Sequence, residues 1–435
     1  QASLDRRAFS GGIDGWLTLD DDGVWALKGY LTGSYITGSA ESIDDLQLSS
    51  RRYLNRPQAD HIEYDPTATS LKGWAGRVML NKQSGNYRLN TALGGMSPGY
   101  EINDLGFQWR ADQINWHCAA GYRWLEPNRT FRDRGLDLAA YQSWDFGGVG
   151  DSGGLGAFWY TVFNNYWAAG GQLFFNPERN SLRATRGGPI MRVPAHQSYS
   201  LWIDTDSRKP IYLLVEGDTW SQGAHAHGAE GELRVVCKPR NNLEVSLGPE
   251  YSWRQDDSQY VTSIDDPAMS ATFGARYLFS DIEYREFSMG TRINWTLTPT
   301  FTIQTYIQPL LASGKYTGLK EFARPSSFEF NRYGRDNGST VTSDENGDYE
   351  IDPDGAGPAE AFTVDNPDFN YKSLKVNMVL RWEYRPGSTF FLVWTQDRVN
   401  FDDPGDFRLG RDARSLFSAP GEDIFLAKFT YWFDM

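Results

Sequence analysis

Residues 373–396, SLKVNMVLRWEYRPGSTFFLVWTQ, carry the alternation that decides the fold class. From Leu374 to Tyr384 every second side chain is large and apolar, whereas the residues between them include Lys375, Arg381 and Glu383. Successive side chains of a β-strand point to opposite faces, so the pattern predicts a strand with one apolar and one polar face. Such an apolar face fits either the interior of a soluble sandwich or the lipid-facing outside of a membrane barrel.

The same period of two recurs along most of the chain, and helical periodicity is nearly absent. No run of about 18 apolar residues could form a membrane-spanning helix. We therefore predict an all-β fold, a single antiparallel transmembrane β-barrel over residues 1–435 with about 18 strands (16–18). The expected strands are 10–19, 24–37, 67–82, 86–97, 103–112, 113–125, 131–146, 155–175, 190–204, 209–220, 225–238, 241–254, 270–281, 283–298, 300–312, 371–385, 388–399 and 423–434.

The connections between the expected strands fall into two groups. Short turns that carry proline join neighbouring strands at KPRNN, TPT and RPGS (238–242, 298–300 and 385–388). The other connections include long segments at 39–66, 177–189, 313–369 and 400–422. Outer-membrane barrels sort their connections in this way, with short turns in the periplasm and long loops outside the cell. A soluble sandwich has no reason to do so.

The composition narrows the possible partners. The formal net charge is −14, which argues against nucleic acid as a partner. The mean hydropathy of −0.55 is compatible with a membrane barrel, because only every second residue of each strand would face lipid. The two cysteines, Cys118 and Cys237, lie on apolar strand faces far apart in the sequence; a disulfide between them is open, and reduced thiols are favoured.

The chain ends in DIFLAKFTYWFDM, an alternating strand rich in aromatic residues. This ending resembles the signal that the barrel-assembly machinery recognises in outer-membrane proteins, although the last residue is Met435 where Phe or Trp is usual. The alternative is an ordinary last core strand. We expect a bacterial outer-membrane location, with outer-membrane lipid and lipopolysaccharide around the wall and the assembly machinery as a partner during biogenesis. The residues expected to face lipid or form the aromatic girdle are Leu374, Val376, Met378, Leu380, Trp382, Tyr384, Phe429, Tyr431 and Phe433. The charged residues expected in the lumen are Arg234, Glu244, Glu250, Arg292, Lys375, Arg381 and Glu383.

Several segments resemble a known family: GYEINDLGF (99–107), TRGGP (185–189), YIQPLLASGKY (306–316) and most of 352–396. The family is the outer-membrane β-barrel of unknown function that commonly follows a family-nine-like carbohydrate-binding domain in Gram-negative bacteria. The resemblance implies a barrel fold, an outer-membrane location and an association with carbohydrate. It implies no reaction.

No residue pattern specifies a catalytic site. GDSGG at 150–154 is similar to a serine-protease loop, but no matching His and Asp contexts accompany it, so a glycine-rich turn is expected. His225 and His227 could hold a metal or line a polar lumen; His61, His117 and His196 occur singly and are expected to be structural. Among the aromatic residues of 157–175, either the set with Trp159, Phe163, Trp167 and Phe175 or the residues between them could line a glycan path.

These observations favour a non-enzymatic function. The leading hypothesis is a porin-like barrel that acts as a transport channel or as the membrane-embedded component of a surface assembly. A barrel that binds a glycan or a protein partner without conduction is the alternative, and an outer-membrane hydrolase or a soluble carbohydrate-binding β-protein remain further possibilities.

The long loop expected at 313–369 is strongly acidic, and we expect it to plug the barrel or cap it outside. Residues 336–371 contain ten acidic residues and no Lys or Arg: Asp336, Asp344, Glu345, Asp348, Glu350, Asp352, Asp354, Glu360, Asp365 and Asp368. Within them, Asp344, Asn346, Asp348 and Asp352 have the one, three, five and nine spacing of a calcium loop. Tyr349 and Gly355 depart from that pattern, where Gly and Glu are usual. The segment is therefore either a solvated acidic loop or a loop ordered by Ca²⁺.

Overall fold

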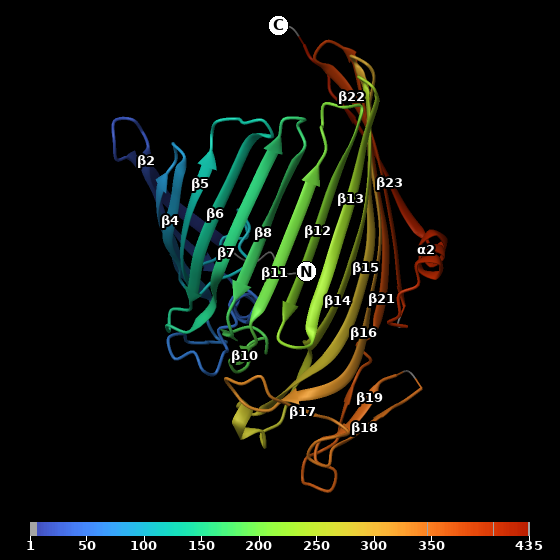
Figure 1. Ribbon diagram of the computed structural model, residues 1–435. Coiled ribbons are helices and arrows are strands. Elements are labelled where there is room, and N and C mark those ends of the chain that lie inside the picture. The colour runs from blue at the N-terminus through green and yellow to red at the C-terminus, as the bar shows by residue number, and fades with distance from the viewer. Residues whose placement is uncertain (1–6, 346, 403, 434–435) are drawn as a thin grey trace.

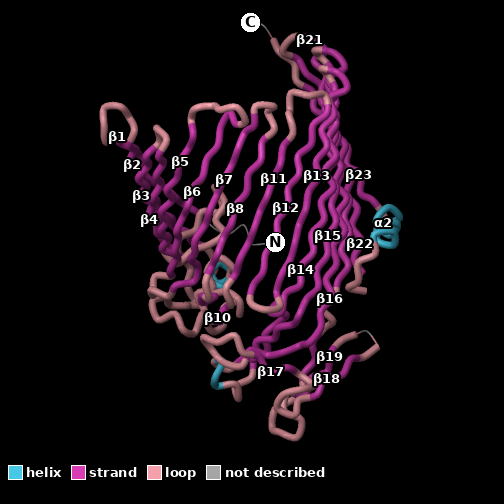
Figure 2. Tube along the Cα trace, viewed as in Figure 1, coloured by secondary structure: helices cyan, strands magenta, loops and turns pink. Residues whose placement is uncertain are grey.

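The computed structural model describes residues 7–345, 347–402 and 404–433, and it consists mainly of one large, curved antiparallel sheet (Figures 1 and 2). Seventeen long strands follow one another across the sheet, and the short β17 (Phe330–Arg332) pairs beside β16. The long strands are β1 (Arg7–Thr18), β2 (Trp25–Thr37), β3 (Ser70–Lys82), β4 (Tyr87–Met96), β5 (Gln113–Trp124), β6 (Phe131–Trp144), β7 (Gly150–Phe163), β8 (Ala168–Asn176), β11 (His196–Asp204), β12 (Ile211–Gln222), β13 (Ala226–Arg240), β14 (Leu243–Asp265), β15 (Ala275–Thr298), β16 (Phe301–Phe322), β21 (Phe369–Arg385), β22 (Ser388–Asp402) and β23 (Gly421–Phe429).

The connections are sorted between the two ends of the sheet. At one end, here called the tight-turn end, every connection has two to six residues, from 241–242 to 19–24. The opposite end, the loop end, carries all the longer connections, among them 38–69 and 323–368. The remaining short elements belong to this end: α1 (Ala40–Leu48), β9 (Arg179–Ser181), β10 (Met191–Val193), the 3-10 helix η1 (Ser270–Thr272), β18 (Thr340–Ser343), β19 (Tyr349–Asp352), β20 (Phe362–Val364) and α2 (Leu409–Ser418).

The all-β class and the large antiparallel sheet agree with the sequence prediction, but several strand assignments were wrong. The expected strand 190–204 is divided into the short β10, which pairs with β9 outside the large sheet, and β11. Residues 103–112 form a turn, because the amide side chains of Asn103 and Gln108 bond backbone groups of 102–110 in place of a neighbouring strand. The expected strand 155–175 is two strands, β7 and β8, since Asn165 accepts a hydrogen bond from the backbone of Trp167 and closes a turn. The expected strands 270–281 and 283–298 are one, β15, which passes through a register shift near Phe279.

The strand register defines two faces that continue across the whole sheet. Leu380 pairs with Ile303, which pairs with Trp295, which pairs with Leu243; the same face therefore runs from strand to strand with large apolar residues. We call this the apolar face. The opposite face carries Arg381, opposite Thr302, and Asn294, opposite Gln304. We call it the polar face.

The two edges of the sheet, β1 and β23, are not paired with each other within the described residues. All residues of both strands are exposed. Because each of the seventeen strands is antiparallel to the next, an odd number makes β1 and β23 run in the same direction. The closed barrel of the prediction is therefore not observed, and the sheet is open between these edges.

The packed hydrophobic clusters lie toward the loop end. Ile43 and Leu46 of α1 pack on Ile36 of β2, which belongs to the polar face. On the apolar face, α2 lies against the outside of β16 and β21, where Leu416 contacts Leu311 and Leu374 (Figure 1). In the described part of the chain, no helix has the length and apolar character needed to cross a membrane.

Candidate functional site

The register places all seven charges predicted for the lumen on the polar face. Several of them are paired, as expected for a face that carries both signs. Arg234 bonds Glu232 at 2.5 Å, Arg381 bonds Glu383 at 3.1 Å, and Lys375 pairs with Asp397 of the neighbouring strand. Lys238 lies 3.6 Å from Glu244, and the Arg292 guanidinium stacks 4.4 Å from the ring of Tyr306. The seven predicted charges belong to four strands, β13, β14, β15 and β21, and Asp397, the partner of Lys375, belongs to β22.

The residues predicted for lipid contact lie on the apolar face, with one difference. Leu374 is buried rather than free for lipid, because Leu416 of α2 covers it. At the tight-turn end, Tyr384 stacks on Phe429 with ring centroids 5.0 Å apart, and its hydroxyl donates to the Thr430 carbonyl. The other predicted members follow the same alternation: Val376, Met378, Leu380 and Trp382 of β21, and Tyr431 and Phe433 after β23.

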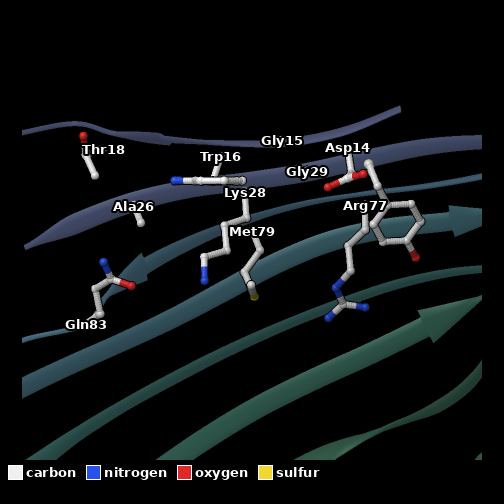
Figure 3. Close-up of a pocket in the computed structure, with 11 residues that line it drawn as sticks. Asp14, Gly15, Trp16, Thr18, Ala26, Lys28, Gly29, Arg77, Met79 and Gln83 are labelled. Atoms are coloured by element: carbon white, nitrogen blue, oxygen red, sulfur yellow. The ribbon is translucent and has the colours of Figure 1, made fainter. Parts of the chain in front are cut away.

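A hollow of about 460 Å³ lies against the polar face of β1, β2 and β3. Trp16 forms one wall and is 76% exposed, and Lys28 and Met79 lie beside it (Figure 3). Asp14 and Arg77 mark one end of the hollow, and Thr18 and Gln83 mark the other (Figure 3). Aromatic rings with a carboxylate and cations around an open hollow can bind small polar solutes. The hollow was not predicted, although the alternation of 10–19 and 24–37 places Trp16 and Lys28 on one face.

At the loop end, three connections, 38–69, 97–112 and 177–195, fold over the polar face and are held together by buried ion pairs and hydrogen bonds. Residues 38–69 reach residues 97–112 through Arg52, whose Nη2 lies 2.5 Å from Glu101. The backbone N–H of Glu101 donates to Ser34 Oγ on the polar face of β2. The connection also reaches 177–195, because Ile190 donates its backbone N–H to the side chain of Gln58. These contacts hold the connections together as a layer of loops across part of the polar face at the loop end.

His61, Asp112 and Asp145 come together within this layer, and their ligand atoms lie within 4.8 Å of one another. The His61 ring nitrogen is 3.0 Å from Asp112. A metal could use such a set, but Arg56 pairs with Asp112 and lies 3.7 Å from Asp145, so a guanidinium already supplies the positive charge. The arrangement is that of an ion-pair network. His61 was expected to be structural, and the network places it in that role.

A further set of arginines was missed by the sequence interpretation. Arg51, Arg52, Arg56, Arg110 and Arg183 line one narrow hollow within the loop layer. Burial, together with the neighbouring Arg183 and Arg56, lowers the pKa of Arg110 to about 10. Arg110 pairs with Asp151 at the start of β7. The segment RRYLNR at 51–56, three arginines in an acidic chain, was the available signal.

The GDSGG segment, residues 150–154, forms the first part of β7 and not the glycine-rich turn that was predicted. Its Asp151 carboxylate accepts a hydrogen bond from Ser143 Oγ at 2.8 Å in addition to pairing with Arg110. The small residues have a steric reason, since a Cβ at Gly153 would lie 2.1 Å from the Gln142 side chain. No protease-like role follows from these contacts.

The acidic segment folds differently from the loop expected at 313–369. β16 continues to Phe322, and residues 340–364 form a small sheet of β18, β19 and β20 that lies beyond the loop end (Figure 1). Ile351 and Val364 of this sheet pack on Leu278 and Leu319 of the extended β15 and β16. The carboxylates stabilise it by accepting backbone N–H groups: Asp344 accepts from Asp348, and Asp368 accepts from Tyr316.

The structure does not bring the predicted calcium ligands together. Asp344 and Asp348 flank the turn between β18 and β19, next to the pair Ser343 and Tyr349. Asp352 pairs with Thr340, three ladder positions away, and its carboxylate accepts the N–H groups of Asp354 and Gly355. Three strand residues span about 10 Å, which is too far for one ion. Asn346 lies outside the described residues.

The remaining candidates separate between the two faces. Trp159 and Phe175 face the apolar side, so the alternate aromatic residues Phe158, Tyr160 and Phe174 are the ones on the polar face. His227 lies on the apolar face against Trp253, 5.1 Å between ring centroids, whereas His225 belongs to the turn before β13. His117 and His196 lie on the polar face within hydrogen-bonding or stacking contacts, to Asn90 and Trp220 respectively. Cys118 and Cys237 are free thiols on the apolar face of β5 and β13.

Together these features define a class: an all-β protein built on one large antiparallel sheet, with an apolar face, a polar face and an inward-folded layer of loops at one end. Residues 45–435 match the family described as a domain of unknown function, DUF5916, and the chain belongs to that family. No curated protein matches the chain.

Proposed function

We propose that the sheet is the wall of an outer-membrane barrel, with the apolar face toward lipid and the polar face toward an aqueous lumen, and that the protein serves as a channel or as the membrane-embedded component of a surface assembly. The observation that carries this proposal is the register. It places large apolar side chains on the same face of one strand after another across the sheet, and many of them are exposed, for example Leu201, Val215 and Leu233 on adjacent strands. A soluble protein rarely leaves so large a continuous apolar surface uncovered.

The sorting of connections supports the same proposal. Strands of about ten or more residues cross a bilayer when tilted, and most of the long strands reach that length. The tight-turn end gathers aromatic residues of the apolar face, including Trp382 and Tyr384, where a bilayer interface would lie. Polar residues would then meet water inside, and the paired charges of β13 to β22 would line the lumen.

The wall is tested with two neighbouring arginine substitutions in β21. Leu380 faces the apolar side and Val379 the polar side. On insertion into lipid vesicles, L380R, which lies between the bilayer midplane and the interface expected at Trp382, should lower the stability of the inserted protein by about 1–3 kcal/mol, whereas V379R should change it by less than about 1 kcal/mol. Urea unfolding from the vesicles measures both. Equal effects, or a wild-type protein that stays soluble without detergent and does not insert, would refute the membrane wall.

Conduction is tested separately in planar bilayers with the wild-type protein. Discrete conductance steps support the channel, while stable insertion without any steps would favour the non-conducting surface assembly. The hollow beside Trp16 and Tyr30 favours a second function, the binding of a small polar solute on the lumen wall. Quenching or shift of tryptophan fluorescence by added oligosaccharides, lost in W16A, would support that function, and no change with any of them would remove it.

A further inference from the structure

One hollow within the loop layer is lined by more positive charge than the carboxylates beside it neutralise. Five arginines line one hollow, as described above. Three of them have close carboxylate partners: Arg52 with Glu101, Arg56 with Asp112 and Arg110 with Asp151. The two that remain are Arg51 and Arg183.

Neither of these two arginines has a carboxylate of its own among the described residues. Arg51 lies 3.7 Å from Glu101, which already bonds Arg52 at 2.5 Å, and the buried Nε atom of Arg51 has no hydrogen-bond partner. Arg183 donates only to the Trp109 carbonyl, at 3.5 Å. Burial lowers the pKa of Arg183, and the neighbouring Arg56 contributes in the same direction. One hollow is therefore lined by two partly buried guanidinium groups: Arg51, which shares Glu101 with Arg52, and Arg183, which has no carboxylate partner among the described residues.

We propose that the hollow between Arg51 and Arg183 is a binding site for an oxyanion group, a phosphate, sulfate or carboxylate, at the mouth of the barrel. Planar guanidinium groups bind such groups through paired N–H donors and are suited to sites shielded from water. The site is narrow, with room for about one water molecule inside, so the oxyanion binds at the rim, where the Arg51 side chain is 31% exposed. The bound group supplies the counter-charge that the protein lacks there.

The position of the arginine hollow suggests a role in transport, and that role rests on the proposed function. The arginines come from three connections, 38–69, 97–112 and 177–195, which lie across the polar face at the loop end. The acidic residues of 336–371 lie elsewhere, on and around the small sheet beyond the ends of β15 and β16. An anionic solute entering the mouth would be repelled by that segment and attracted by the arginine hollow.

The experiment is isothermal titration calorimetry of the full chain in neutral detergent, at constant ionic strength set with NaCl. Inorganic phosphate, sulfate and acetate are titrated separately, so that the three arms show which oxyanion is preferred. The variants are R183Q, which removes a side chain with only one weak bond and should fold normally, and R51Q/R183Q. The control is R324Q/R335Q, which makes the same charge change at two exposed arginines of the 323–368 connection.

We expect saturable binding of at least one oxyanion to wild type and control, and a loss of about tenfold or more in affinity in R183Q and R51Q/R183Q. Equal affinity in all four proteins, or no binding above the chloride background in wild type, would overturn the proposal. Because binding is measured in detergent, it does not depend on conduction. Binding without conductance steps would support the oxyanion site and refute only the channel. Conductance steps without binding would support the channel and refute the oxyanion site.

Discussion

The ion pair between Arg52 and Glu101 gives the most quantitative prediction from the structure. The Arg52 side chain is 0% exposed and that of Glu101 is 3% exposed, with 2.5 Å between Nη2 and Oε2. The second Glu101 oxygen accepts the backbone N–H and the side-chain amide of Asn103, at 2.8 and 2.7 Å. Both oxygens of Glu101 are thus used as acceptors, one on each side.

Glu101→Gln keeps the shape of the side chain but cannot satisfy both sides. If the amide oxygen faces Arg52, the amide nitrogen meets the N–H donors of Asn103; if the amide turns over, it meets the guanidinium. Removing one partner of a buried ion pair costs about 3–5 kcal/mol. Since 1.4 kcal/mol is tenfold, opening of the 38–69 connection should become roughly a hundredfold to several-thousandfold more frequent.

Limited trypsin digestion, with cleavage after Arg51 or Arg52, measures that opening when opening and closing are fast relative to cleavage; Pro57 blocks cleavage after Arg56. The matched control is Glu178→Gln, which removes an exposed pair in which Arg192 and Glu178 are 43% and 58% exposed. This change should cost less than about 1 kcal/mol and leave cleavage at 51–56 unchanged. Equal cleavage rates in wild type and E101Q would show that the pair does not hold the connection.

The same pair predicts a pH dependence with a defined sign. Burial alone would raise the pKa of Glu101, but Arg52 and the Asn103 donors outweigh it and lower the pKa below the ordinary 4.5. A carboxyl group whose pKa is lowered on folding contributes stability above its unfolded pKa, and this contribution is lost as pH falls through the folded value. Opening of the 38–69 connection should therefore become more frequent below about pH 4.5 in wild type, whereas this pair contributes no such increase in E101Q. Digestion with pepsin, which is active in acid where trypsin is not, measures the difference.

Three further predictions concern α2, the cysteines and the acidic segment. The Leu416 side chain of α2 is 1% exposed, so Leu416→Ala should destabilise the packing of that helix by about 2–5 kcal/mol and speed trypsin cleavage after Arg411. Leu409 is 50% exposed, and Leu409→Ala should not change the cleavage rate. Equal rates in the two variants would contradict the described packing. In lipid vesicles, Cys118 and Cys237 should react with a membrane-permeable maleimide and resist a charged thiol reagent. Mass spectrometry measures the labelling. Rapid reaction of both cysteines with the charged reagent would show that the apolar face is in water. Because Asp352 is remote from Asp344, a protease that cuts after glutamate should cleave 336–371 equally fast with millimolar-range calcium and with chelator. Protection by calcium would restore the metal site.

Most of the sheet could be predicted because the alternation of apolar and polar residues within each strand shows which of its residues share a face. Alternation fixes which residues share a side, and pairing adds only their neighbours; the seven expected lumen charges therefore fell on one face without any knowledge of the partners. The errors arose where alternation was incidental. GFQWR alternates, yet Gln108 and Asn103 close a turn there, and the Asn165 turn interrupts what looked like one strand.

The loop layer could not be predicted for a different reason. Arg52 and Glu101, or Arg110 and Asp151, are separated by many residues, and only the fold of three connections brings them together. Charged residues in loops carry no periodic signal that identifies their partners. The acidic segment was misjudged on the same ground, since charge counting predicts repulsion but not that Asp344 and Asp368 would be used as acceptors of backbone N–H groups.

The odd number of strands limits how the proposed wall can be completed. Hydrocarbon offers no partner for backbone N–H and C=O groups, so neither β1 nor β23 can stay unpaired within a bilayer. These two edges run in the same direction, and joining them directly would make a parallel pair in an otherwise antiparallel sheet. A wall closed by antiparallel pairing alone needs an odd number of additional strands between them, which also brings the total to the even number usual in bacterial barrels. Such a strand must continue the apolar face that Ile13 and Leu17 present at one edge and Phe425 and Phe429 at the other.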